Sequence, residues 1–133
     1  MSIVPRKNII TALGTKINSS IGSSLGNRVY YTGEAPQDKS LPLAIYFGVS
    51  DVPHYDMNKE SLDATYQISI FDEKDKGALS ITNIGDTLIN SLSRETITIT
   101  GYSNVDVQIL EAGRTVVEGD YLQLIIEIRI QGF

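Results

Sequence analysis

Residues 28–53 decide how this chain can fold, and they read RVYYTGEAPQDKSLPLAIYFGVSDVP. A short β-branched and aromatic run at 28–31 is followed by a loop that contains Pro36, and Pro42 then precedes a second apolar run at 43–49. Proline cannot donate a hydrogen bond to a neighbouring strand, so both prolines are expected outside the strands. The stretch therefore predicts two short strands joined by a loop.

On either side of this stretch the apolar residues recur with a helical period. Residues 4–21 carry isoleucine or leucine at every fourth position, and residues 77–93 carry a similar stripe. Both segments predict helices with one apolar face. Gly85 lies in the middle of the second helix, where glycine costs about 1 kcal/mol relative to alanine. We expect this glycine to allow a close approach to the sheet.

The remaining strands are predicted from alternation and composition. Residues 61–71 alternate apolar and polar side chains, which is typical of a strand with one buried face. Three more strands are expected at 96–100, 105–110 and 121–130. In the last of these Ile125 interrupts the polar face, either as a subunit contact or as a scattered surface residue.

The predicted order is one helix, three strands, a second helix and three further strands. Two amphipathic helices can bury their apolar stripes against one face of an antiparallel or mixed sheet, which predicts an α+β fold. A chain of 133 residues suits a single domain, 1–133, with one core. The opposite sheet face is expected to be solvated or to meet a partner.

Composition and charge exclude several classes of function. The chain has no cysteine, hence no disulfide framework and no thiolate metal site. It has no apolar run long enough to span a membrane and no signal-peptide pattern, which fits a cytoplasmic product. The net charge is −5, but residues 1–50 carry an excess of three basic side chains and residues 51–75 an excess of five acidic ones. Such a chain is poorly suited to binding phosphates; its acidity serves solubility or a surface past which DNA slides.

Motifs that would indicate an enzyme or a metal site fail on their context. Residues 22–26 match G-x-S-x-G, but the predicted helix precedes the serine and the expected strand follows it, the reverse of a nucleophile elbow. His54 is the only histidine and lies in a polar segment. Lys74 and Lys76 stand where a calcium loop starting at Asp72 needs oxygen ligands. We therefore predict no catalytic residue, no cofactor site and no metal site.

The segment 50–60 is polar and is predicted to be the longest loop. It contains aromatic, sulfur-containing and charged residues side by side, a composition that suits a docking surface and equally suits a loop folded on its own core. The candidate interface residues are Asp51, His54, Tyr55, Asp56 and Met57 in this loop, Pro36 and Gln37 in the loop 33–41, and Ile125.

The order and character of these segments resemble the tail terminator (tail completion) family of long-tailed bacteriophages over nearly the whole chain. The resemblance is carried by the N-terminal helix, Val29-Tyr30, Ala35-Pro36, Leu41-Pro42, Val49-Ser50-Asp51, the alternating strand 61–71, the helix 77–93 and Arg129-Ile130. The second helix departs from the family, because it is rich in Ile, Ser and Asn where relatives carry more Ala and Arg.

The resemblance implies a ring-forming structural protein of the virion. Such proteins form a ring, usually of six subunits, on the head-proximal end of the tail tube at the tail-neck junction, after assembly in the host cytoplasm. The ring stops polymerisation of the tube protein and presents a surface to head completion or stopper proteins. DNA passes through the lumen without specific binding, and no membrane is involved. The acidic candidates for the lumen are Asp51, Asp56, Asp72, Glu73 and Asp75.

Two alternatives remain open. The chain could be another neck component, such as a head completion or stopper protein. It could also be a small enzyme or ligand-binding domain, which an apolar pocket with convergent polar groups would favour.

Overall fold

A computed structural model of the chain describes residues 6–33, 40–56, 59–94, 97, 99 and 105–132. These residues form two α-helices, five strands and one 3-10 turn. Their bounds are α1 (Arg6–Ile21), β1 (Val29–Tyr31), β2 (Leu43–Asp56), β3 (Lys59–Glu73), η1 (Lys74–Lys76), α2 (Ala78–Arg94), β4 (Val105–Glu118) and β5 (Tyr121–Gly132).

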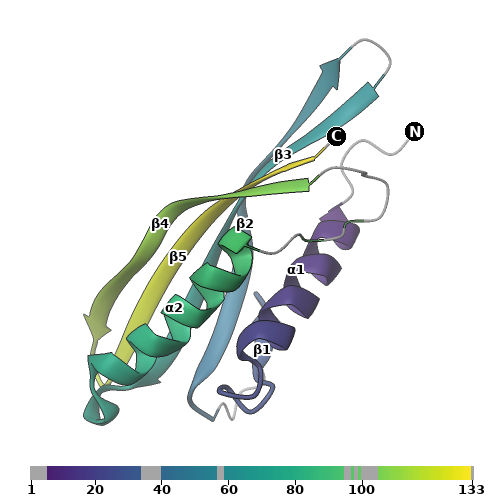
Figure 1. Cartoon of the computed structure of the whole chain (residues 1–133). Helices are drawn as coiled ribbons and strands as arrows, with labels where there is room; N and C mark the ends of the chain where they lie inside the picture. Colours follow the sequence, from purple (N-terminus) through teal and green to yellow (C-terminus); the bar gives the residue numbers. More distant parts are fainter. Residues whose placement is uncertain are drawn as a thin grey trace.

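The five strands form one mixed sheet in the order β1-β2-β3-β5-β4. The pairs β2–β3, β3–β5 and β5–β4 are antiparallel, whereas β1 pairs with β2 in parallel. Both helices lie on the same side of this sheet (Figure 1). The predicted α+β class, with two helices on one face of an antiparallel or mixed sheet, is therefore confirmed.

The apolar stripes of the helices meet the apolar face of the sheet in one core. The predicted stripe of α1, which consists of Ile9, Leu13, Ile17 and Ile21, is completely buried. From the sheet, alternate residues of β3 and β5 enter the same core, among them Tyr66, Ile68, Ile126 and Ile128. Burial of this apolar area is the main favourable term in folding. In the described part of the chain, no helix is long and apolar enough to cross a membrane.

Two glycines let the helices approach the sheet. A Cβ atom at Gly85 of α2 would overlap Cδ2 of Leu124, so the close approach expected at this position is confirmed. At Gly14 of α1, a Cβ atom would overlap the hydroxyl oxygen of Tyr46. That hydroxyl donates a 2.7 Å hydrogen bond to the carbonyl oxygen of Ile10 in the same helix. A side chain at either position would require Leu124 or Tyr46 to move, or the helix to shift.

The prediction of a loop at 50–60 is wrong. Strand β2 continues to Asp56 and β3 begins at Lys59, so almost the whole segment is a β-hairpin. Pro53 lies inside β2, opposite Leu62. The bonds from Ala44 N to Arg28 O and from Thr32 N to Tyr46 O show which backbone groups of β2 face β1. After the register shift between Gly48 and Ser50, the same alternation turns the nitrogen of Pro53 toward the open edge, where no ladder bond is lost.

The C-terminal third also differs from the prediction. Strand β4 is 14 residues long and extends well past the expected end at Leu110. Its register against β5 shifts between Ile109 and Glu111 and again between Ala112 and Arg114, and these bulges break the alternation on which the prediction relied. Ile97 and Ile99, the described residues of the strand expected at 96–100, belong to no strand, although both are buried in the core.

Candidate interaction surfaces

The sheet face opposite the helices carries an apolar patch. Cross-strand partners lie on the same face, and the rows Tyr30–Ile45–Ser69–Ile125 and Phe47–Gln67–Glu127 alternate with the rows that enter the core. We call the half-buried residues Tyr30, Ile45, Phe47, Phe71 and Ile125 the outer apolar patch. Ile125, which the sequence marked as an exception on a polar face, therefore lies on the same sheet face as apolar residues from other strands.

A hydrogen-bonded polar group lies in the middle of this patch. Ser69 is only 2% exposed, and its hydroxyl oxygen accepts hydrogen bonds from Nε2 of Gln67 at 3.2 Å and from Nε2 of Gln123 at 3.0 Å. Because both amides are held by one hydroxyl, they cover Ser69 and orient each other. The outer apolar patch thus surrounds a fixed polar group.

An ion pair with two hydrogen bonds joins β3 and β5 on the same face, near the end of their pairing. Arg129 Nε donates to Asp63 Oδ1 at 2.8 Å, and Arg129 Nη2 donates to Asp63 Oδ2 at 2.6 Å. The hydrogen bond and the charge of Asp63 raise the pKa of the Arg129 guanidinium above its ordinary value, and burial opposes this shift only weakly. The guanidinium therefore stays charged at any pH at which the folded chain can be studied.

Two carboxylates face each other farther along this face. Glu111 of β4 lies directly opposite Glu127 of β5. Both side chains are half-buried, and among the described residues neither has an ion-pair partner. Like charges directly opposite in a sheet are unfavourable. The pair makes this part of the outer face acidic in the isolated subunit.

The end of the β2–β3 hairpin projects beyond the rest of the sheet. Pairing between β3 and β5 stops at Leu62–Gly132, whereas pairing between β2 and β3 continues to Asp56–Lys59. We call residues 53–56 and 59–61 the arm. In Figure 1 the arm extends past both helices and the other strands. A two-stranded ribbon without a third strand is only marginally stable in water, which suits a segment that packs against a partner.

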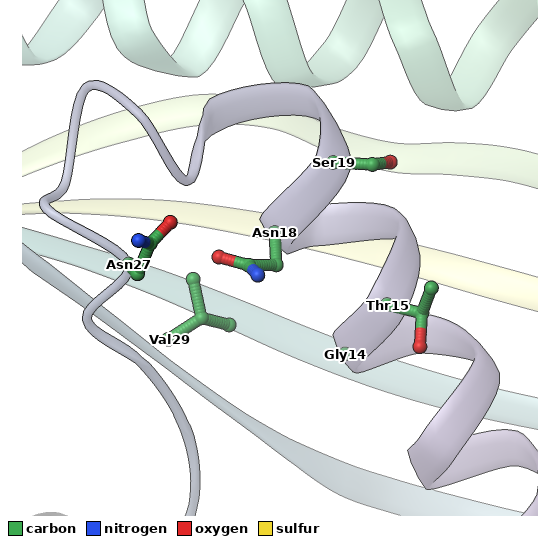
Figure 2. Close-up of a pocket in the computed structure, with 6 residues that line it drawn as sticks. All are labelled: Gly14, Thr15, Asn18, Ser19, Asn27 and Val29. Carbon is green, nitrogen blue, oxygen red and sulfur yellow. The ribbon is translucent and has the colours of Figure 1, made fainter.

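A groove lies between α1 and β1, at the border of the sheet that β1 forms. It has a volume of about 420 Å³ and is lined by Gly14, Thr15, Asn18, Ser19, Asn27 and Val29. Figure 2 shows the Asn18 side chain between the helix and the chain segment that bears Asn27 and Val29. The lining offers amide and hydroxyl groups and no ionisable side chain, so it supplies neither an acid nor a base to a reaction.

The structure distributes the predicted interface residues over separate places. Asp51 is in β2 at the base of the arm, and His54, Tyr55 and Asp56 are in the arm itself. Ile125 lies on the outer face of the sheet. Pro36, Gln37 and Met57 lie outside the described residues. The structure thus brings His54, Tyr55 and Asp56 together on one strand and separates them from Ile125.

The acidic residues proposed for a lumen also differ in their positions and exposure. Asp72 is 1% exposed; its Oδ1 accepts a 2.8 Å bond from the backbone nitrogen of Glu73 and lies 3.7 Å from Lys76 Nζ. This buried carboxylate lies at the end of β3 and does not face solvent in the subunit. Glu73 and Asp75 are exposed.

Sequence reasoning missed several residues of these surfaces. Glu111 was missed because the bulges in β4 hide its strand, although Glu127 was already on the expected polar face. Asn18 and Asn27 are far from any motif, and only the packing of β1 beside α1 brings them to one groove. No local signal in the sequence could have found that groove.

The comparison with solved structures finds a protein of similar architecture. No protein-family description and no curated protein matches the sequence. Among solved structures, the chain is similar to a chain of the virion of a native gene transfer agent particle, with a TM-score of 0.72 and 12% sequence identity. The match covers 92% of this chain and 96% of the other. Two chains of nearly the same extent therefore share one fold.

Proposed function

We propose that this chain is a structural subunit of a phage-like virion that caps the head-proximal end of a tail tube as a ring. The observation that carries the proposal is the match, over almost the full length of both chains, to a virion chain of a gene transfer agent particle. The resemblance of the sequence to tail terminators, stated on independent grounds, supports the finer role. In this role the chain stops tube polymerisation, joins the tail to head-neck proteins and catalyses no reaction.

The surfaces suit a protein that works by contact. The outer apolar patch lies on a sheet face that no described helix covers, and the arm projects from the body. The groove beside α1 has no ionisable lining, which supports binding over catalysis. An enzyme or a small-ligand domain is expected to have an apolar pocket with convergent polar groups, and this groove is not such a pocket.

Passage of DNA fits the acidic balance of the chain. The net charge is −5, and Glu73 and Asp75 are exposed. We keep these two residues, together with Asp51 and Asp56, as lumen candidates and omit the buried Asp72. A lumen lined by carboxylates offers no partner to phosphates, so DNA can pass without being held. A ring of six such subunits stays part of the proposal.

Assembly of a tail tube in the presence of the purified chain tests the proposal. The tail-tube protein of the same particle is polymerised with and without the chain, and the tubes are examined by electron microscopy. We expect substoichiometric amounts to arrest elongation and to add a ring of density at one end of each tube. Tubes of unchanged length with bare ends would contradict the terminator role. Binding to head-neck proteins without any effect on tubes would instead identify a stopper or head completion protein.

A further inference from the structure

In the structure, the basic and the acidic segments of the sequence belong to different parts of the subunit. Residues 6–33, which form α1, the turn after it and β1, contain Arg6, Lys7, Lys16 and Arg28 and no acidic residue. Lys7 is exposed, and Arg28 is held beside β2 by a 2.9 Å hydrogen bond from its Nε to the carbonyl oxygen of Pro42. We call α1, the turn and β1 together the basic edge of the subunit.

The arm and its base carry the opposite charge. Between Asp51 and Ser61 the sequence contains Asp51, Asp56 and Glu60 against a single lysine, Lys59. The next carboxylate, Asp63, is already occupied by Arg129. The arm and its base are thus acidic in sequence, whereas the basic edge of the same copy carries only basic charges.

The basic edge also has the shape and the free backbone to receive an extended segment. The groove of Gly14, Thr15, Asn18, Ser19, Asn27 and Val29 opens on it. Strand β1 lies at the border of the sheet, and its bonds to β2 involve Arg28 O and Thr32 N. By strand alternation the backbone groups of Val29 and Tyr31 point the other way, where no described strand pairs with them. Amide side chains and an open strand edge together suit a polypeptide backbone.

We propose that the arm of one copy docks on the basic edge of the next copy, in the groove between α1 and β1. The occupant is a second copy of this chain, because the charges of the arm and of the basic edge are complementary within one sequence. Such a contact joins two different surfaces, so each subunit can accept one neighbour and engage another, and the series closes into a ring when the rotation permits. This inference rests on the ring proposed above and names the contact that builds it.

Disulfide trapping tests the contact, because the chain has no cysteine of its own. Lys59→Cys in the arm is combined with Thr15→Cys in the groove, and the matched control combines Lys59→Cys with Asn90→Cys, an exposed site on α2. Both proteins are oxidised with and without the tube protein. We expect a ladder of linked multimers from the first pair only, and a weaker ladder at high salt. No ladder under either condition, or an equal ladder from the control, would overturn the inference.

Charge reversal provides the second readout. Asp56→Lys with Glu60→Lys reverses the charge of the arm, and Lys7→Glu with Thr11→Glu makes two exposed positions of α1 acidic. Either reversal alone should abolish the ladder, and the two reversals in one chain should restore it. A mixture of the two reversed proteins should also cross-link, in alternation. If the reversed arm cross-links as well as the original arm while all variants melt at similar temperatures, the proposed contact is absent.

The two proposals can fail separately. Ladder formation without arrest of tubes would leave the contact between copies in place and would remove the terminator role. Arrest of tubes without a ladder would leave the terminator role in place and would show that the arm docks elsewhere.

Discussion

Arg129 of β5 holds Asp63 of β3 by two parallel hydrogen bonds, of 2.8 Å and 2.6 Å, across the outer face of the sheet. In the register Asp63 is opposite Gln131 and Arg129 is opposite Thr65, so the pair is diagonal. Asp63 is next to Leu62, the residue at which pairing with β5 ends. The ion pair therefore links β3 to β5 at the base of the arm.

Loss of this pair should loosen the arm and leave the core intact. In Asp63→Asn and in Arg129→Lys, we expect faster amide hydrogen exchange in residues 59–63 and unchanged exchange at Ile68 and Ile126. The reason is that the link between β3 and β5 needs both hydrogen bonds of the charged pair. The raised pKa of Arg129 means that its charge, and hence its contribution to stability, persists below that pKa and is lost only above it. Uniformly faster exchange would show that the pair supports the whole sheet.

Truncation inside the helical stripe should destabilise the chain strongly. Leu13 has no exposed surface, and Leu13→Ala removes buried apolar area and leaves a cavity. We expect the free energy of unfolding in urea to fall by about 3 kcal/mol. Thr11→Ala, on the exposed face of the same helix, is the matched control and should change it by less than about 0.5 kcal/mol. Equal effects at the two sites would contradict the assignment of the buried face.

The contact between Gly14 and Tyr46 should be visible as coupling between two substitutions. Gly14→Ala places a methyl group against the Tyr46 hydroxyl and should displace its bond to Ile10 O, at a cost of about 1–2 kcal/mol. Once Tyr46→Phe has removed the hydroxyl, Gly14→Ala should cost less, because the higher helix propensity of alanine then acts unopposed. A double-mutant cycle from urea unfolding measures the coupling, and additive effects would show that the two residues do not meet.

Removal of the Ser69 hydroxyl should release both amides that bind it. Ser69→Ala leaves Nε2 of Gln67 and of Gln123 without their common acceptor, and we expect a loss of about 1 kcal/mol in the free energy of unfolding. Ser69→Thr retains the oxygen and is the comparison variant. The side-chain amide NMR signals of both glutamines should shift in the alanine variant. An unchanged spectrum would mean that the network does not form in solution.

Much of the fold could be predicted because burial leaves a periodic record. The stripe of α1 and the alternation of β5 repeat along the chain with the period of the structure, so helix, strand and buried face were all read correctly. The segment 50–60 was misread, because Pro53 and the polar residues around it suggest a loop. At an open edge, however, a strand tolerates proline and polar side chains.

The surfaces depended on contacts between residues far apart in the chain. The outer apolar patch needs Tyr30, Ile45 and Ile125 in one row, and the groove needs Asn18 beside Val29. Two bulges in β4 also reset which of its residues face outward. No local pattern contains this information.

By itself the amino-acid sequence determined which residues are buried in the helices and in the regular strands, the α+β class and the separation of basic and acidic segments. Only the tertiary structure decided the strand order, the parallel pairing of β1, the projection of the arm and the position of the groove. The physical reason is that periodicity records how each residue meets water, whereas strand order and register are set by hydrogen bonds and packing between distant residues.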